Sequence, residues 1–574
     1  MLSFFRKSLI PGIAIVLFGF VLWGCAAKVP PADLVLHNGK VVTVDASKPE
    51  AQAIAVREGL VAAVGADKEI EAYIGPSTRV IDLAGRLAVP GFIESHGHFT
   101  GIGESRLTLN LMKSRNWDEI VAQVGEAAKK AKPGEWILGR GWHQEKWDVK
   151  PSPNVEGFPL HESLSKASPN NPVILSHASG HATIANAKAM QLAGITRATP
   201  NPPGGEILRD TRGNPIGVFR ETASGLLRRA LSDYQAKRSP QQAEADARKE
   251  VELAIEECLS KGITTFHDAG VSFKTVDLYK SFADTGRLGL RLYAMIREGN
   301  DALARNLAKY RLINYAGSHL TVRSIKRQID GALGPRGAWL LDPYQDLAAS
   351  TGLNTTTAAE ITDTAKLALE NDFQLCVHAI GDRANRETLN IYEAAFKTHP
   401  GKKDLRWRVE HAQHLSLADI PRFGALGVIA AMQGIHCTSD APYVLARLGP
   451  KRAEEGAYVW QKLMKSGAII SNGTDAPVED VNPIACYYAT VSRKLKDGTV
   501  FYADQRMSRA EALKSYIWNG AYAAFEENVK GSLAQGKLAD ITVLSKDILT
   551  IPEDEIPTAE VLYTIVGGKI LYQK

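Results

Sequence analysis

The stretch PGFIESHGH, residues 90–98, determines how the rest of the chain is interpreted. Its apolar start is typical of a buried β-strand, in which residues two apart project to the same side. His96 and His98 therefore point the same way, and Gly97 between them is expected to leave room for a metal ion. A bare His-x-His also fits two unrelated surface histidines, because metal binding by imidazole depends on further ligands. The other strands must supply those ligands.

Length and composition indicate a globular protein with more than one structural unit. The chain has 574 residues, of which 45% are hydrophobic and 23% are charged, so a disordered or fibrous class is excluded. This length exceeds one ordinary core, and a large domain with a smaller one is expected. The net charge is only +5 and no basic run contains interleaved aromatic residues, so nucleic-acid binding is not predicted. Nothing in the sequence indicates an oligomeric state.

Residues 1–24 have the layout of a secretory signal. Arg6 and Lys7 precede an apolar run over residues 9–23, which is shorter than the roughly 20 residues that a membrane-spanning helix needs. Residues 22–25, LWGC, resemble a bacterial lipobox in which Cys25 is lipidated, although Trp23 stands where a small residue is usual. The alternative is an uncleaved anchor helix. Both predict a bacterial cell-envelope protein tethered outside the inner membrane, on the periplasmic face, with residues 25–31 as the tether.

The other cysteines form no disulfide or metal-binding pattern. Cys258, Cys376, Cys437 and Cys486 are widely spaced and lie mostly in apolar runs. Buried free thiols are therefore expected.

Short β-strands are predicted at both ends of the chain. Residues 34–44 are two β-rich runs around Asn38-Gly39, which is a strong hairpin signal. A second hairpin is predicted around Gly567-Gly568. Because isolated hairpins are marginally stable, residues 32–90 and 530–574 are expected to form one small β-sandwich together.

Strand and helix signals alternate between these ends. Eight short apolar strands are predicted, with ends at or near residues 96, 267, 296, 329, 378, 411, 432 and 472. Helical stretches lie between several of them, including residues 243–260, 358–370 and 383–397. This pattern predicts an α/β fold with a (β/α)8 TIM-like barrel over residues 91–529.

A large insertion follows the first predicted barrel strand. Residues from about 104 to 236 are far more than one connecting helix requires. Insertions after a barrel strand emerge on the catalytic face, so this one is expected to roof a site. The alternative is a separate structural lobe.

Four further side chains lie near the C-terminal ends of predicted barrel strands. Lys326 lies within the fourth strand, and His378 and His411 end the fifth and sixth. Asp475 follows the eighth. Alone, each fits a structural role, since Asp475 before Ala-Pro also suits a turn. Because catalytic residues of a barrel come from this end of several strands, all four are expected to converge with His96.

Several segments in a fixed order resemble one known family. They are residues 90–98, 262–270, 326–334, 377–384, 409–414, 473–478 and 531–540, with residues 204–206 and 217–221 inside the insertion. Together they are similar to the amidohydrolase superfamily, and specifically to amidohydrolase family 3 or its YtcJ-like branch, which includes N-substituted formamide deformylases. The resemblance implies a barrel with a terminal β-sandwich. It also implies a metal-dependent hydrolase of carbon–nitrogen bonds other than peptide bonds.

The resemblance further implies a set of metal ligands. His96, His98, Lys326 and Asp475 would hold one divalent ion, and Lys326, His378 and His411 a second. An ammonium group cannot bind a cation, so Lys326 is expected to be carbamylated and to bridge two ions, with a single-metal site as the alternative. Zinc is the expected metal, although imidazole and carboxylate also suit manganese, iron or cobalt.

The expected reaction follows from these ligands. A metal-activated hydroxide attacks the carbonyl carbon of a small amide, with Asp475 as the catalytic general base that passes the proton to the leaving nitrogen. One alternative is a ring-amidine deaminase that uses the same site. Another is a non-catalytic lipoprotein that binds a solute or a metal, which leaves Asp475 without a role.

Five other residues are weaker candidates. Trp142, His177 and His181 in the insertion fit substrate-pocket groups or internal supports of the lobe. Arg336 fits a substrate contact or a solvated side chain. Asp268 is expected either to orient a ligand histidine or to cap the following helix.

Overall fold

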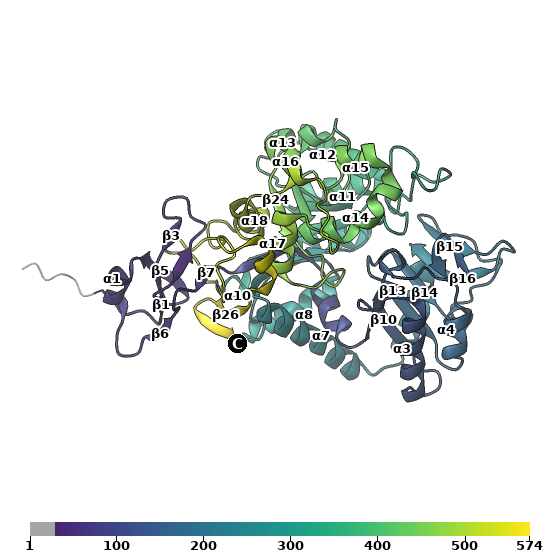
Figure 1. Cartoon of the computed structure of the whole chain (residues 1–574), viewed down its shortest axis with the longest axis horizontal. Helices are drawn as coiled ribbons and strands as arrows, with labels where there is room; N and C mark the ends of the chain where they lie inside the picture. Colours follow the sequence, from purple (N-terminus) through teal and green to yellow (C-terminus); the bar gives the residue numbers. More distant parts are fainter. Residues whose placement is uncertain (1–28) are drawn as a thin grey trace, which may run out of the picture.

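The computed structural model describes residues 29–574. The predicted secretory signal and the predicted lipidation at Cys25 lie outside the described residues. Within the described range, no helix is both long and apolar enough to cross a membrane. Three parts follow one another along the long axis of the molecule, namely the terminal β-sheets, the barrel and the insertion (Figure 1).

Eight parallel strands form the barrel. In order around it they are β8 (Phe92–Gly97), β17 (Ile263–Val271), β18 (Arg291–Ile296), β20 (Leu320–Gln328), β21 (Gln374–Ala379), β22 (Arg408–His411), β23 (Ile429–Gln433) and β24 (Ile470–Gly473). Backbone hydrogen bonds from Asp475 N to His96 O (2.8 Å) and from His98 N to Ala476 O (2.7 Å) join the last strand to the first. The predicted TIM-like barrel is confirmed.

Helices connect the barrel strands. They include α7 (Pro240–Ser260), α8 (Phe273–Asp284), α9 (Asn300–Tyr310), α11 (Ala358–Glu370), α12 (Asp382–Thr398), α13 (Ile420–Leu426), α14 (Gly434–Leu448) and α17 (Pro483–Ser492). Helix α11 begins where Thr357 accepts a hydrogen bond from Glu360 N (3.2 Å), which satisfies one of the free amides of its first turn. Because each helix returns the chain to the start of the next strand, the C-terminal strand ends meet at one rim.

The insertion lies between α2 (Phe99–Ser105) and α7 and is built on its own sheet. The strands of that sheet, in spatial order, are β15 (Gly205–Arg209), β16 (Pro215–Glu221), β14 (Ala182–Ala185), β13 (Val173–His177), β10 (Ile137–Trp142) and β9 (Leu109–Asn110). The sheet packs against helices that include α3 (Trp117–Lys130) over a separate apolar core. The insertion is therefore a lobe with its own core (Figure 1).

Strands from both termini share the β-sheets at the other end of the molecule. One sheet has the order β27 (Lys569–Gln573), β26 (Val561–Val566), β25 (Ile541–Leu544), β7 (Leu87–Pro90), β2 (Lys40–Val42) and β3 (Glu50–Ala51). The other has the order β5 (Leu60–Gly65), β4 (Ala53–Arg57), β1 (Leu34–His37) and β6 (Arg79–Asp82). One apolar cluster contains residues of both sheets, so the expected combination of the two chain ends is confirmed.

The two predicted hairpins have different outcomes. Strands β26 and β27 pair antiparallel around Gly567-Gly568, which have positive φ angles, so this hairpin is confirmed. The hairpin at Asn38-Gly39 was predicted wrongly, because β1 pairs with β4 and β6 whereas β2 pairs with β3 and β7. Asn38 has φ of 55°, and the chain crosses there from one sheet to the other.

A buried ion pair ties the barrel to the terminal sheets. Arg291 in β18 donates to both carboxylate oxygens of Asp540, at 2.7 and 2.9 Å. Asp540 also accepts from Gly567 N (2.8 Å) in the turn of the C-terminal hairpin. Both charged side chains are almost fully buried.

Asp540→Asn should therefore destabilise the protein strongly. The substitution leaves the Arg291 guanidinium buried without a counter-charge, which costs about 3–5 kcal/mol of unfolding free energy. Chemical denaturation would measure this loss. Asp554→Asn is the matched control, because Asp554 pairs with Lys494 at the exposed surface, and it should change the unfolding free energy little.

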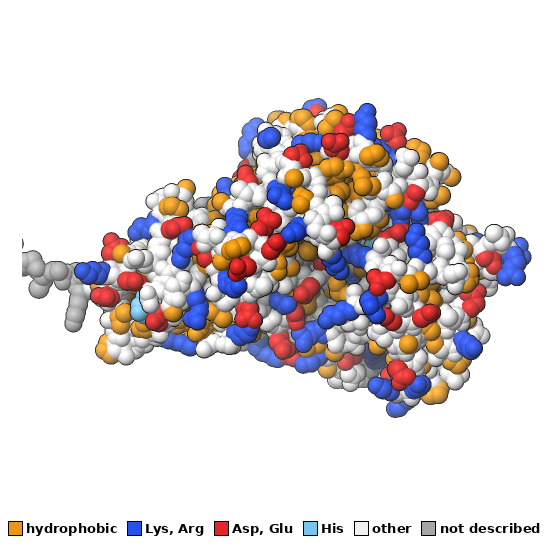
Figure 2. Space-filling model, viewed as in Figure 1, with side chains coloured by type: hydrophobic (Ala, Val, Ile, Leu, Met, Phe, Trp, Pro, Cys, Tyr) orange, Lys and Arg blue, Asp and Glu red, His pale blue; other side chains and the backbone are white. Residues whose placement is uncertain are grey.

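The charged surface and the cysteines agree with the composition. On the face drawn in Figure 2, Lys and Arg are interspersed with Asp and Glu, as a net charge of +5 suggests. The four cysteines of the described chain, Cys258, Cys376, Cys437 and Cys486, are buried and free, as predicted.

Candidate active site

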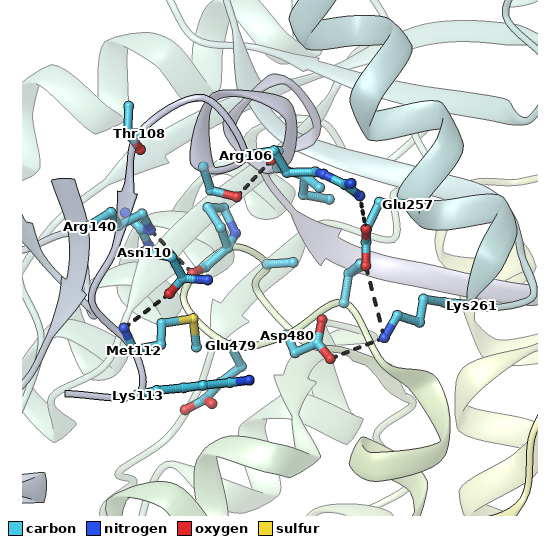
Figure 3. A pocket seen from close by; sticks show the side chains of 15 residues that line it. Arg106, Thr108, Asn110, Met112, Lys113, Arg140, Glu257, Lys261, Glu479 and Asp480 are labelled. Carbon is cyan, nitrogen blue, oxygen red and sulfur yellow. Dashed lines mark hydrogen bonds and ion pairs between the residues drawn. The ribbon is translucent and has the colours of Figure 1, made fainter. Parts of the chain in front are cut away.

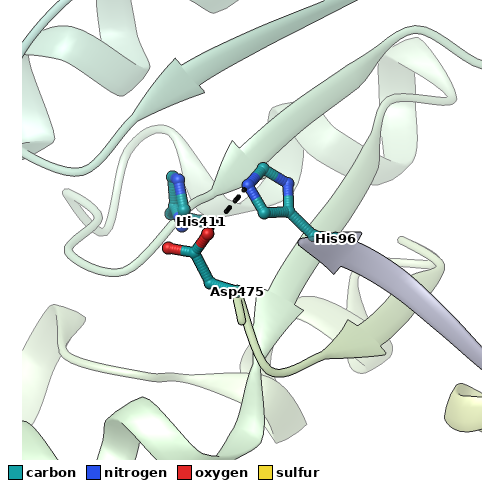
Figure 4. A group of neighbouring side chains, drawn as sticks. All are labelled: His96, His411 and Asp475. Carbon is teal, nitrogen blue, oxygen red and sulfur yellow. Dashed lines mark ion pairs between the residues drawn. The ribbon is translucent and has the colours of Figure 1, made fainter. Parts of the chain in front are cut away.

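Side chains from the first, sixth and eighth barrel strands meet at the C-terminal rim. Ligand atoms of His96, His411 and Asp475 all lie within 4.8 Å of one another. Figure 4 shows the Asp475 carboxylate next to both imidazole rings. His98 Nε2 lies 3.3 Å from Asp475 Oδ1. These contacts bring both histidines of the His-x-His stretch against the predicted catalytic carboxylate.

The fourth and fifth strands complete the cluster. Lys326 Nζ lies 3.5 Å from His96 Nε2. The ring centroid of His378 lies 4.4 Å from that of His411. The structure therefore brings all six predicted metal-ligating side chains into one group, although they are spread over 380 positions of the sequence.

Two of these residues have an unusual backbone conformation. His411 has φ of 77° and Asp475 has φ of 59°, in the left-handed region that non-glycine residues rarely occupy. Hydrogen bonds from Ala412 N to Ala379 O (3.1 Å) and from Asp475 N to His96 O hold the two segments. Strain of this kind is typical of functional sites, where the surrounding structure keeps a side chain in place.

Burial controls the charges in the cluster. It lowers the pKa of His96 to about 4 and that of Lys326 to about 8, so the imidazole is neutral and the amine is more easily deprotonated. Burial alone would raise the pKa of Asp475, but the neighbouring imidazoles of His98 and His96 hold that pKa well below its usual value. The cluster thus combines the neutral imidazole of His96 with the ionised carboxylate of Asp475.

This donor set suits a divalent cation. His378 Nε2 and Asp475 Oδ1 are buried and have no partner with hydrogen-bond geometry in the described chain. Buried polar atoms are normally satisfied, and a metal ion satisfies both kinds of atom. The residues present are therefore able to hold a metal here.

A buried charged pair fixes the orientation of His96. Glu410 contacts His96 Nδ1, and Arg408 donates to both oxygens of Glu410 at 2.7 and 2.8 Å. Burial alone would raise the pKa of Glu410, but Arg408 and His96 lower it, so the carboxylate is ionised. Because Glu410 contacts Nδ1 of His96, the Nε2 atom is directed toward Lys326 and Asp475.

Glu410→Gln should weaken metal binding. The amide cannot accept the proton of His96 Nδ1 as strongly, so the ligand loses basicity and fixed orientation, and metal affinity should fall about 10–100-fold. Competition with a chelator would measure the affinity. The melting temperature of the metal-free variant serves as the folding control, and an unchanged affinity would contradict the role of Glu410.

A cavity lies directly above the cluster. Its wall includes His411 and Asp475 from the barrel and Ser179 and His181 from the insertion. His181 Nδ1 is 2.7 Å from Glu221 Oε2, and its ring lies 5.0 Å from that of His378. The insertion thus covers the site as well as forming a lobe, so the two alternatives for it are compatible.

Comparison with known proteins identifies the family. The sequence profile of the Amidohydrolase family, Amidohydro_3, matches residues 79–572. The chain belongs to this family. It is 32% identical to Protein LONG AFTER FAR-RED 3 of Arabidopsis thaliana, over 94% of this chain and 92% of that protein.

Two bacterial proteins are also similar over 94% of this chain. Putative amidohydrolase YtcJ of Bacillus subtilis is 29% identical, with 99% of it covered. The N-substituted formamide deformylase of Arthrobacter pascens is 29% identical, with 98% of it covered. An uncharacterised metal-dependent hydrolase from Pyrococcus horikoshii has the same fold, with a TM-score of 0.71 at 24% identity over 91% of this chain and 99% of that chain. The resemblance inferred from the sequence motifs is confirmed.

Within this amidohydrolase, three weaker candidates do not reach the cavity wall. Trp142 is fully buried in the core of the insertion, where Nε1 donates to Leu175 O (2.9 Å). His177 packs edge-on against Trp142 and contacts Gln144 Oε1 at 3.1 Å. Arg336 is buried against Asp346 at 3.0 Å. These residues support the walls, whereas His181 lines the cavity.

Asp268 caps a helix, but not the helix that follows its own strand. Its Oδ1 accepts from Phe99 N (3.2 Å) at the start of α2, and its Oδ2 accepts from Tyr279 OH (2.5 Å). It makes no hydrogen bond to a ligand histidine in the described chain. Because Phe99 follows His98 directly, the cap holds the backbone next to that histidine.

Sequence reasoning missed Glu94 and misinterpreted Gly97. Glu94 accepts from Thr474 N (2.6 Å) and contacts Thr474 Oγ1 (3.0 Å), which holds the segment before Asp475. Its place two residues before His96 could have indicated the shared face. Gly97 does not make room for a metal as predicted, because its Cβ would lie 2.6 Å from Phe266 Cζ. Strand alternation turns it toward that ring instead.

His436 was also missed. Gln413 Nε2 lies 2.9 Å from His436 Nδ1 and donates to it, which places the ring proton on Nε2. That Nε2 is buried without a hydrogen-bond partner in the described chain, and the residue lines the cavity. His436 lies in the first turn of α14, and its ring stacks 6.4 Å from that of His411. It therefore offers an unused hydrogen-bond donor beside the cluster.

Proposed function

We propose that this amidohydrolase cleaves a carbon–nitrogen bond of a small amide with the help of a bound divalent metal, zinc. The observation that carries the proposal is the convergence of His96, His411 and Asp475 with Lys326 at the barrel rim. Family membership supports hydrolysis. The name of the Arthrobacter pascens relative, N-substituted formamide deformylase, supports an amide-type substrate.

The proposed mechanism assigns the proton transfers to Asp475. A divalent ion at this site would supply a water of lowered pKa, from about 15.7 to about 7, and would polarise the amide carbonyl. The ionised Asp475 carboxylate accepts the proton of the attacking water. It then returns that proton to the leaving nitrogen, so the amine departs neutral.

The environment of Lys326 supports the carbamate hypothesis. The side chain is 2% exposed, and no carboxylate in the described part of the chain lies within ion-pair distance of Nζ. A buried lysine without a counter-ion favours the neutral amine, which is the form that reacts with carbon dioxide. A carbamylated Lys326 would bridge two ions, one on the side of His96 and His98 and one on the side of His378 and His411.

His436 is proposed to bind the substrate. Its Nε2–H has no hydrogen-bond partner among residues 29–574, and the residue lines the cavity beside His411. A donor in this position is suited to the carbonyl oxygen of the amide, where negative charge develops during the attack. The role of Gln413 is then to keep the donor proton on that nitrogen.

The location in the cell is proposed from the sequence alone. The signal-like residues 1–24 and the lipobox-like residues 22–25 support export and lipidation at Cys25. Mass spectrometry of the mature amino terminus would show either a diacylated cysteine or an unprocessed signal.

The deciding experiment combines metal analysis with a substrate screen. The purified protein should contain one or two divalent ions per chain, and 13C NMR after incubation with 13C-bicarbonate should show a carbamate carbon. The metal-loaded protein should hydrolyse members of a panel of N-acyl, N-formyl and cyclic amides. A protein that binds metal and hydrolyses none of them would overturn the proposal, whereas ammonia release from heterocycles would favour the deaminase alternative.

A further inference from the structure

A second, larger cavity adjoins the one above the metal cluster. Its volume is about 670 Å³, against about 40 Å³ for the inner cavity. The loop from Asp475 to Asp480 contributes to both, and Glu479 lines both. The inner cavity has space for only a small group, so a larger substrate would extend into the adjoining outer pocket.

The carboxylates that line the outer pocket all form ion pairs. On one wall, Glu257 contacts Arg106, and Lys261 lies 3.9 Å from Glu257 and 3.3 Å from Asp480, a chain that Figure 3 shows. The third carboxylate, Glu479, is 3.2 Å from Lys146. Every carboxylate of the pocket is thus paired with a cation.

Arg140 on the other wall has no such partner among residues 29–574. Its Nε donates to Pro477 O (3.2 Å) and its Nη2 donates to Ala178 O (2.9 Å). No carboxylate of residues 29–574 forms an ion pair with it. The side chain is half-buried, and its guanidinium remains charged at neutral pH.

The two hydrogen bonds of Arg140 connect the walls of the two cavities. Pro477 is two residues from Asp475, and Ala178 lines the inner cavity. If Arg140 only joined the two loops, it would not need a charge, because neutral donors can also form hydrogen bonds to the two backbone carbonyls. An unpaired charge that is partly withdrawn from water is costly, and its retention beside a substrate cavity indicates an anionic ligand.

We propose that the outer pocket binds a carboxylate of the substrate through Arg140, so that the substrates of this enzyme are small amides that carry a carboxylate near the scissile bond. The inference rests on the proposed amide hydrolysis and specifies its substrate class. Arginine suits this role because its planar guanidinium pairs with both oxygens of a carboxylate.

The test compares matched acidic and neutral amides. N-acetylglycine is paired with N-acetylglycinamide, and N-methylsuccinamate with N,N′-dimethylsuccinamide, which place the carboxylate on the amine or the acyl side. Wild-type enzyme should prefer one acidic member by at least 10-fold in kcat/KM. Arg140→Gln, which keeps neutral donors for the two carbonyls, should lower kcat/KM for that acid about 10–100-fold and leave its neutral partner nearly unchanged.

Lys113→Gln is the charge-matched control. Lys113 lines the same pocket, is exposed and forms no ion pair in the described structure, so its removal subtracts the same charge. It should change the acidic preference less than 3-fold. An equal effect of both substitutions would mean that only net charge matters and would overturn the assignment to Arg140.

A binding measurement separates this inference from the proposed function. Calorimetric titration of N-acetylglycine and N-methylsuccinamate into the metal-free protein, which cannot turn them over, should show binding that Arg140→Gln weakens. Equal binding of the neutral partners, or no binding of either acid, would overturn the inference. Hydrolysis of neutral amides without acidic preference would leave the proposed function intact, whereas carboxylate binding without any hydrolysis would count against the proposed function alone.

Discussion

Asp475→Asn should abolish nearly all turnover while the protein still binds metal. The asparagine side chain has the same shape and keeps an oxygen that can ligate an ion, but it cannot accept a proton from water. General-base catalysis contributes about 10²–10⁴-fold to the rate, so kcat should fall by that factor. Steady-state kinetics together with metal analysis of the same sample would measure both quantities.

The control for this variant is Asp497→Asn. Asp497 is exposed in a turn, where it accepts from Thr499 N (2.9 Å), and the substitution makes the same chemical change far from the cluster. It should leave kcat within 2-fold of wild type. If Asp475→Asn also retained close to the native rate, another group would have to act as the base.

His96→Ala should remove metal and activity together. His96 contributes to the cluster through contacts to Asp475 and Lys326, and its removal takes away the ligand at the centre of the group. Metal content should fall below 10% of wild type, and activity should fall in parallel. Plasma emission spectrometry and a kinetic assay of the same preparation would test this.

The fold must be checked separately, because His96 is fully buried. His96→Asn keeps a polar group next to Glu410 and should lose metal with a smaller change in melting temperature than His96→Ala. His399→Ala, at the end of α12, is the matched control and should leave metal content unchanged. Full metal occupancy in both His96 variants would mean that this stretch is not a metal-binding element.

Local patterns were enough to predict the barrel. Its strands are short apolar runs that alternate with helices, and the helix predicted at residues 358–370 has the same bounds as α11. The position of the predicted ligands at one rim follows from the same pattern, because a side chain at the C-terminal end of a parallel strand lies at the common rim, whereas their role as metal ligands is what the family resemblance implies. His378 and His411 could therefore be placed without knowledge of any contact.

Patterns failed where pairing partners lie far away in the sequence. The Asn38-Gly39 turn is a good hairpin signal, yet β1 and β2 join different sheets because each finds its partner strands elsewhere. For Trp142 the sequence left open a pocket group or an internal support of the lobe, and only the separate core of the insertion, which encloses it, decided for the support. A local turn preference contributes only a small free energy. It does not outweigh the free energy gained when a whole strand or an indole ring is buried.

The stretch PGFIESHGH shows which features the local sequence predicts and which depend on the tertiary structure. The sequence alone determined that His96 and His98 share one face of a barrel strand, because side-chain alternation is a property of the strand itself. Only the tertiary structure decided that Glu410 orients His96, that Gly97 faces Phe266, and that Arg140 lies beside the site without an ion-pair partner among residues 29–574. Those facts depend on strands and loops that are distant in sequence and are brought together by barrel closure and by the insertion.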